Sequence, residues 1–234
     1  MFPPDPPPGA LVPSNGLRLA TDDLNREANH RIANNLSAIA GLVRLHAAEV
    51  ASRRADLFSG ADVRSMLDEI GSRIETVGRL HRLLSDAPPG EEINLAVHLT
   101  ETAEALVSSL SRGDLISLSC DGVENCYIDP DQAAPVALIV NELVTNAIKH
   151  SHPAGAPGNI MVHCGVGLGG SLYVEVEDDG VGLPEDFDPR TDGSLGFQVV
   201  RGLADQLGAR LVFDGDGIGL RVRLMVPVRA LEAA

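Results

Sequence analysis

The chain has no tryptophan, and aromatic residues make up only 3% of its 234 positions. Because hydrophobic residues still reach 44%, the core must be aliphatic. The three cysteines are an odd number without metal-ligand spacing, so we expect reduced, partly buried thiols. Basic residues number 18 against 33 acidic ones, and the net charge of −15 argues against nucleic acid and anionic membranes as partners. Since the chain lacks both an apolar run of about 18 residues and a signal-peptide pattern, we expect a cytoplasmic protein.

Two helical patterns follow a proline-rich lead-in over residues 1–19, which we expect to be disordered. Over residues 32–50 and again over 63–84, apolar or neutral side chains recur in alternating steps of four and three. Gly60 can turn the chain between the two patterns, so residues 20–88 are predicted to form a helical hairpin. A lone hairpin buries only one side of each helix. We therefore expect a homodimer in which two hairpins form a four-helix bundle.

The pattern changes after a proline-glycine break at residues 87–90. Strands and helices then mix without a strict βαβ alternation, which predicts an α+β layer sandwich over residues 94–229. Asn94 and Asp129 are placed to cap two of its helices, and Gly208 is placed to end a third. The predicted helices cover about residues 95–110, 130–150 and 195–207, and the predicted strands cover 116–120, 127–129, 160–166, 172–177, 210–213 and 220–226.

The helix expected to end near residue 150 carries a group of four polar side chains, Glu142, Asn146, Lys149 and His150. Their spacing of four, three and one places the first two and one of the last two on the same helix face. Carboxylate and amide oxygens suit a magnesium ion, and the cations suit a triphosphate. A solvated helix face would have the same composition.

A second group follows the strand predicted over residues 172–177. Asp178 stands at the strand end, and Gly180 and Gly182 can form a tight bend whose backbone approaches a flat ligand closely. A fixed carboxylate at this point can accept a hydrogen bond from an exocyclic amine, such as that of adenine. A plain acidic β-turn would contain the same residues.

A third group, Gly193, Leu195 and Gly196, opens the apolar helix predicted over residues 195–207. Glycines at a helix N-terminus offer free backbone N–H groups and the positive end of the helix dipole to phosphate oxygens. A short glycine loop alone is weak evidence for such a site.

Together and in this order, the three groups resemble the ATP-binding domain of histidine kinases, whose fold is shared with the gyrase, Hsp90 and MutL ATPases. The resemblance implies binding of ATP and Mg²⁺. It makes Asn146 the magnesium ligand, and Glu142 a group that assists the metal or its water shell. It also implies that Asp178 binds the adenine amine, with Gly180 and Gly182 beside the base.

The resemblance also assigns the phosphate side of this site. The segment between the second and third groups would form the lid; it is short, and Phe187 is only a weak candidate for the usual phenylalanine motif. The residues expected to face the phosphates, or to lie under them, are Lys149, His150, Gly193, Leu195 and Gly196.

One histidine in the first helical pattern distinguishes among the proteins that share this fold. His30 lies one place beyond the heptad seam, so its imidazole is expected at the bundle surface, within reach of a docked domain. A lone helical histidine is usually ordinary surface. Here the His-Arg-x-x-Asn-Asn-Leu stretch over residues 30–36 resembles the phosphoacceptor box of HWE-related histidine kinases. The absence of tryptophan excludes the strict HWE signature, and Ala33 stands where this subgroup often has a basic residue.

The resemblance implies that His30 takes the γ-phosphoryl group of ATP and passes it to an aspartate of a response-regulator receiver domain. Glu27, one helical turn back, is the carboxylate best placed to take the proton from the other ring nitrogen. Arg31 could steady the transferring phosphoryl group. Both charges could equally be exposed helix surface. His46 and His81 lie on the seams, where packing is the expected role.

Two other functions stay open. One is a histidine phosphotransfer or scaffold protein with a weak or inactive ATP site, although such proteins lose the asparagine and aspartate retained here as Asn146 and Asp178. The other is a serine kinase of the anti-sigma type, which would have no use for the hairpin and His30. No sensor domain fits before the hairpin. A signal would therefore come from a separate sensor protein or through the lead-in, unless the chain is a fragment.

Overall fold

The computed structural model describes residues 59–86, 92–110, 115–122, 126–152, 156–167, 170–188, 191–192, 195–215 and 219–227, with isolated positions 40, 41, 43, 44 and 47. The start of the first predicted helix, with Glu27, His30 and Arg31, lies outside these residues. The elements in chain order are α2 (Gly60–Asp86), β1 (Ile93–Asn94), α3 (Leu95–Leu110), β2 (Ile116–Gly122), β3 (Tyr127–Ile128), α4 (Pro130–Asn146), the π-helical turn η2 (Ala147–Ser151), β4 (Gly158–Val166), β5 (Leu172–Asp178), α5 (Leu195–Leu207), β6 (Arg210–Asp214) and β7 (Leu220–Val226).

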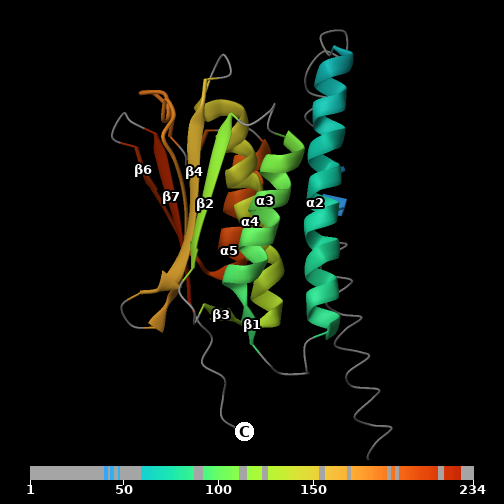
Figure 1. Cartoon of the computed structure of the whole chain (residues 1–234), viewed down its shortest axis with the longest axis vertical. Coiled ribbons are helices and arrows are strands. Elements are labelled where there is room, and N and C mark those ends of the chain that lie inside the picture. Colours follow the sequence, from blue (N-terminus) through green and yellow to red (C-terminus); the bar gives the residue numbers. More distant parts are fainter. Residues whose placement is uncertain are drawn as a thin grey trace, which may run out of the picture.

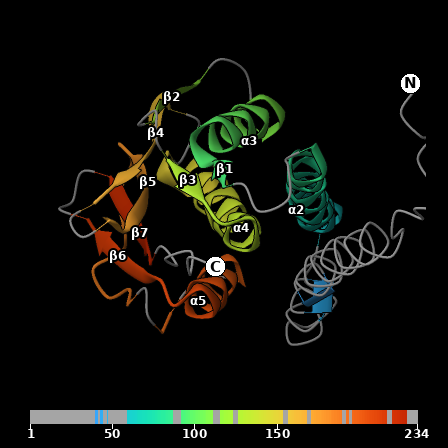
Figure 2. The same ribbon diagram turned by 90° about the horizontal axis from the view of Figure 1, so that it is seen from below.

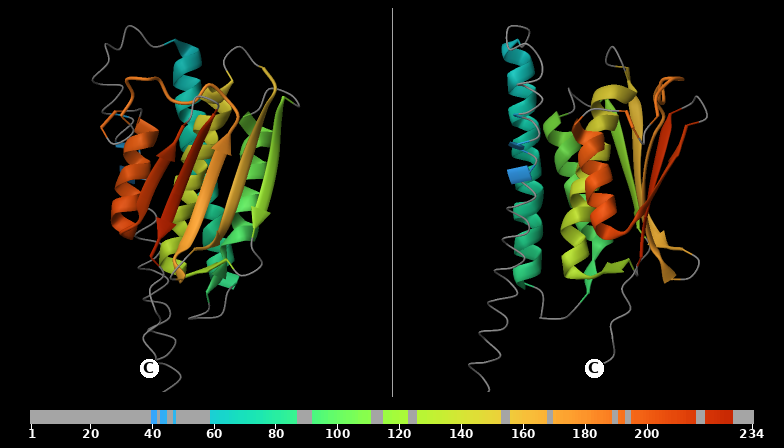
Figure 3. Two further views of the ribbon diagram at one scale, coloured as in Figure 1. Left: turned by 90° about the vertical axis from the view of Figure 1, so that its left-hand side faces the viewer. Right: turned by 180° about the vertical axis from the view of Figure 1, so that it is seen from behind.

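Five strands form one sheet in the order β2-β4-β5-β7-β6, with β2 parallel to β4 and the other neighbours antiparallel. Helices α3, α4 and α5 cover one face of this sheet (Figure 1). Helix α2 lies outside the helix layer and contacts α4 (Figure 2). The views from the side and from behind show the same succession of sheet, three helices and outer helix (Figure 3). The predicted α+β layer sandwich is confirmed.

Short-range signals explain where the elements begin and end. The side chain of Asn94 accepts a hydrogen bond from the backbone of Ala96 at 3.1 Å and so caps α3. Asp129 caps α4 in the same way, and a proline occupies the first helical turn. Gly208 ends α5 with a φ of 62°, which glycine adopts without steric cost. The predicted boundaries of these helices are correct, except at the C-terminal end of α4.

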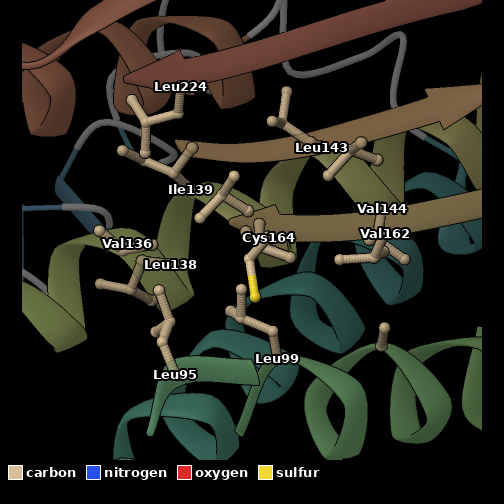
Figure 4. Packing of buried hydrophobic residues seen from close by; sticks show 14 of the residues in the cluster. Leu95, Leu99, Val136, Leu138, Ile139, Leu143, Val144, Val162, Cys164 and Leu224 are labelled. Carbon is tan, nitrogen blue, oxygen red and sulfur yellow. The ribbon is translucent and has the colours of Figure 1, made fainter. Parts of the chain in front are cut away.

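The core between the helices and the sheet is aliphatic, as predicted (Figure 4). Leu99 of α3, Ile139 of α4 and Leu224 of β7 are all at most 1% exposed. Cys126 and Cys164 are buried as free thiols, and a hydrogen bond between them, with burial, raises the pKa of Cys126. These cysteines therefore act as small core residues.

The predicted seam of helix α2 is exposed at some positions and buried at another. Val63, Leu67 and Ile74 of the predicted heptad seam are exposed, the second by 63%. Val77, on the same seam, is buried and joins the main core cluster.

Among the described residues, no helix combines the length and apolar character that crossing a membrane requires.

Candidate functional site

The central strand of the sheet ends in a carboxylate that faces the helix layer. Along β5, Leu172, Val174 and Val176 are buried on the helix side, and Asp178 continues this row with 8% exposure. Pairing with Ile160 of β4 on one side and with Leu220 of β7 on the other holds its backbone. An ionisable group therefore stands where the alternation of the strand calls for an apolar one.

Asp178 is only partly satisfied within the described part of the chain. Its Oδ1 atom accepts a hydrogen bond from the backbone N–H of Gly180 at 3.0 Å. Burial raises the pKa of the Asp178 carboxyl group above its usual range. Hydrogen bonds from the backbones of Gly180 and Leu220 oppose this effect and lower the pKa. A buried carboxylate with free acceptor capacity is suited to a ligand that donates hydrogen bonds.

A π-helical turn faces this carboxylate. The predicted α-helix to residue 150 is wrong by one turn, because α4 ends at Asn146 and η2 follows it. The hydroxyl of Ser151 donates a hydrogen bond to the carbonyl of Ala147 and contacts the ring of His152 at 2.7 Å. Turns of this type are frequent at functional sites because they change the direction in which side chains point.

A cavity of about 340 Å³ lies between α4, η2 and the strands β5 and β7. Its volume falls within the range of small-molecule sites, and its wall is mainly apolar with a few polar groups. It brings together five residues that the sequence singles out, from two stretches far apart in the chain: Asn146, His150, Asp178, Gly182 and Phe187. The sequence did not indicate the rest of the wall, formed by Leu143, Ala147, Ser151, Val176, Val181, Leu183, Pro184, Phe197, Leu220 and Val222.

The bend after β5 packs directly on the π turn. A Cβ atom added to Gly180 would lie 2.2 Å from the carbonyl oxygen of Ser151, which leaves no room for a side chain. The same carbonyl accepts a hydrogen bond from Val181 at 2.9 Å. Gly182 has a φ of 70°. Gly180 therefore brings two parts of the chain together and does not line the cavity itself.

Gly180→Ala should destabilise the fold by about 1–3 kcal/mol, because its methyl group would overlap the backbone of Ser151. The matched control is Gly202→Ala on the exposed face of α5, where an added Cβ meets no atom within 4 Å. Alanine there should stabilise by about 0.5–1 kcal/mol, because helical glycine is entropically costly. Thermal unfolding of the three proteins checks both signs. Equal shifts would contradict the packing described for Gly180.

Two phenylalanines line one side of the cavity, and a third packs behind them. The ring of Phe187 meets Phe197 edge-on with centroids 5.4 Å apart, and Phe197 lies 6.0 Å from Phe213. Phe187, a weak candidate from sequence, thus lines the cavity and contacts the first turns of α5.

The third sequence group meets the first at the start of α5. A Cβ atom added to Gly196 would lie 2.9 Å from Oε2 of Glu142 and 3.6 Å from both polar atoms of the Asn146 side chain. The glycine therefore leaves space beside these two polar groups. Gly193 lies outside the described residues, and of Leu195 only the backbone is described.

Two predicted residues have unexpected surroundings. Lys149 is part of η2 and does not line the cavity. Glu142 is 2% exposed, and its two carboxylate oxygens both accept hydrogen bonds from Arg73 of α2. Nothing in the local sequence pattern indicated this partner, which lies 69 residues away.

Two parts of the chain match known protein families. Residues 27–110 match a family described as histidine kinase. Residues 131–230 match the histidine kinase-, DNA gyrase B- and HSP90-like ATPases. The chain belongs to the histidine kinase family. Relatives in this family include the blue-light-activated histidine kinase 2 of Erythrobacter litoralis, which is 30% identical over 86% of this chain and 56% of the relative.

Other kinases of the family support this membership. The sensor histidine kinase PdtaS of Mycobacterium tuberculosis is 34% identical over 90% of this chain and 40% of its own length. The solved structure of the Erythrobacter litoralis EL346 blue-light activated histidine kinase matches with a TM-score of 0.70 and 29% identity, covering 88% of this chain and 60% of that one. The chain thus spans 40% to 56% of these two curated relatives.

The site fits the nucleotide that an ATPase of this family binds. Asp178 offers a buried acceptor, and the wall around it is apolar, which suits a base with an exocyclic amine. The Nδ2 atom of Asn146 is buried without a hydrogen-bond partner among the described residues. Since an amide can present either its nitrogen or its oxygen, this side chain can offer a hard ligand to magnesium.

Proposed function

We propose that the chain is a protein-histidine kinase that binds ATP with Mg²⁺ in this cavity, phosphorylates its own His30, and passes the phosphoryl group to an aspartate of a response-regulator receiver domain. The observation that carries the proposal is the Asp178 carboxylate, which ends an apolar row of the central strand and lines the same cavity as Asn146. Family membership supports phosphorylation on histidine, because the matched relatives are named as histidine kinases.

Asp178 binds the base by accepting a hydrogen bond from its amine. The apolar side chains of Leu143, Val176 and Val222 exclude water from the base. At the other end, Asn146 would hold the magnesium ion, and His150 provides a hydrogen bond toward the phosphates. Lys149, on the same turn but outside the cavity wall, provides positive charge near them.

The start of α5 completes the phosphate side. The backbone N–H groups of Leu195 and Gly196 stand at the start of α5, the positive end of its helix dipole. Gly193, which lies outside the described residues, is proposed to add to this group. When bound, Mg·ATP supplies the transferable phosphoryl group and the metal charge that neutralises the leaving diphosphate. The protein's part at this end is to orient the chain of phosphates.

His30 takes the phosphoryl group on one neutral ring nitrogen. Glu27 accepts the proton of the other nitrogen, and Arg31 stabilises charge on the group in transfer. Glu142 assists the metal or its water shell when its carboxylate is free.

Incubation of the protein with γ-labelled ATP tests the function. The expected product is an acid-labile, base-stable phosphoprotein, because acid cleaves a phosphoramidate and not a serine ester. Transfer of the label to an added receiver domain should follow. An acid-stable product would favour a serine kinase, and the absence of both label and ATP binding would favour a phosphotransfer protein.

The chain is also proposed to act as a homodimer through the hairpin. Leu67 is 63% exposed on the α2 seam, as an interface residue would be in a single chain. Leu67→Glu should convert a dimer into a 24.6-kDa monomer by light scattering, because a charge in a heptad seam opposes packing. Val97→Glu, at a 53% exposed position of α3, is the matched control and should leave the mass unchanged. A monomeric wild type would contradict the four-helix bundle.

A further inference from the structure

A buried ion pair links the outer helix to the nucleotide-binding half of the chain. Arg73 of α2 donates through Nε and Nη2 to the two carboxylate oxygens of Glu142 in α4. The exposed fraction of both side chains is 3%. A bidentate guanidinium–carboxylate pair fixes direction as well as distance, so it sets how α2 lies on α4.

Neighbouring hydrogen bonds extend the same contact. The amide of Asn141 donates to the hydroxyls of Thr76 at 2.8 Å and Ser72 at 3.1 Å. Water can replace each of these partners once the helices separate. The contact is therefore polar and specific, and it differs from the aliphatic packing that holds α4 on the sheet.

The ion pair engages both carboxylate oxygens of Glu142, which are the atoms that Glu142 would use in the reaction. A group that takes a proton or orders a metal-bound water must lie within hydrogen-bond distance of it. Here both oxygens accept hydrogen bonds from Arg73. In this arrangement both oxygens of Glu142 are engaged by Arg73, so the carboxylate is withheld from a proton or a metal-bound water.

We propose that the Arg73–Glu142 pair is an autoinhibitory latch, in which docking of α2 on α4 withholds Glu142, and movement of α2 away from α4 releases it for phosphorylation of His30. The inference rests on the proposed kinase function. It assigns Arg73 as a positioning residue that acts through Glu142. Since α2 also carries the exposed seam of Val63, Leu67 and Ile74, any partner or signal that moves this helix would change the state of the latch.

The first test is Arg73→Met, which keeps an unbranched apolar stem and removes the guanidinium. Glu142 would then be buried and unpaired for as long as α2 stays docked on α4. The arrangement in which α2 has moved away from α4 therefore becomes favoured. The rate of His30 labelling at saturating ATP should rise on the order of tenfold. The dissociation constant of ATP should change by less than about twofold, because the base contact is elsewhere. Arg64→Met, at an exposed arginine of the same helix, should leave both quantities unchanged.

A second variant avoids leaving a charge unpaired. Ser72→Ala with Thr76→Val removes the hydroxyl partners of Asn141 and leaves the ion pair intact. It should raise the labelling rate in the same direction, by about two- to threefold, and increase backbone hydrogen exchange in α2. If Arg73→Met fails to fold by circular dichroism, this variant decides.

Labelling that stays at the wild-type rate, or falls, in a folded variant with faster exchange would overturn the latch. That result is distinct from failure of the proposed function. In the latter case neither the wild type nor any variant would be labelled on histidine although ATP binds, and the latch would fall with it.

Discussion

Asp178→Asn is expected to weaken ATP binding about 100-fold, because the amide keeps the shape of the side chain and loses the charged acceptor. Hydrogen bonds to charged groups contribute about 1.5–3 kcal/mol, and each 1.4 kcal/mol is a factor of ten in the dissociation constant. The amide nitrogen would also face the amine of the base, donor against donor. Isothermal titration calorimetry with Mg·ATP measures the change.

Glu177→Gln is the matched control, because Glu177 is the preceding residue on β5, points to the other face of the sheet and pairs with Arg221. Its affinity should equal that of the wild type. Burial raises the pKa of Asp178, and the ionised form is the acceptor. Wild-type affinity should therefore fall as the pH is lowered through this raised pKa, at a higher pH than for an ordinary aspartate, while Asp178→Asn should stay flat. Wild-type affinity in Asp178→Asn would remove the base contact.

His30→Gln is expected to lose the label from γ-labelled ATP entirely, because glutamine has no nucleophilic ring nitrogen. ATP affinity should stay within about twofold of the wild type, since His30 precedes the nucleotide-binding half of the chain. The variant should therefore lose the labelling rate while it keeps the affinity for ATP. Autoradiography after acid and base treatment, with calorimetry on the same sample, makes the measurement.

Two further variants frame this result. His81→Gln alters a histidine on the predicted seam and should keep the label. Asn146→Ala should lose the label by the opposite route, through the metal site. A label that persists in His30→Gln would contradict the histidine-kinase mechanism and favour an acceptor hydroxyl elsewhere.

Element boundaries were predictable where one residue carries the signal. Asn94, Asp129 and Gly208 act within one turn of their own position, so a local reading locates the ends of α3, α4 and α5. The site residues Asn146 and Asp178 were predictable for a related reason. Asn146 belongs to a polar face of its helix and Asp178 stands at a strand end beside two glycines, so both signals are local, and the two residues line one cavity.

Features that depend on distant partners were not predictable. The π turn from Ala147 has the same local residue pattern as a continuing α-helix, and its contact with the bend at Gly180 forms only in the folded chain. Lys149 lies on this π turn and outside the cavity wall, which the local pattern did not indicate. The local sequence does not distinguish Arg73 from other helix charges, because its partner Glu142 is 69 residues away.

The position of Asp178 on β5 has a consequence for how this protein can change over evolution. Side chains of a strand alternate between two faces, so inserting or deleting one residue in β5 would exchange the odd and even positions that follow it. Glu177 would then face the helices, and its ion pair with Arg221 on the opposite face of the sheet would be lost. Because β4 and β7 both hold β5 in register, substitutions can be tolerated along this strand while a single-residue change in length cannot. The proposed base contact therefore depends on the number of residues in β5 that precede Asp178 as well as on the aspartate itself.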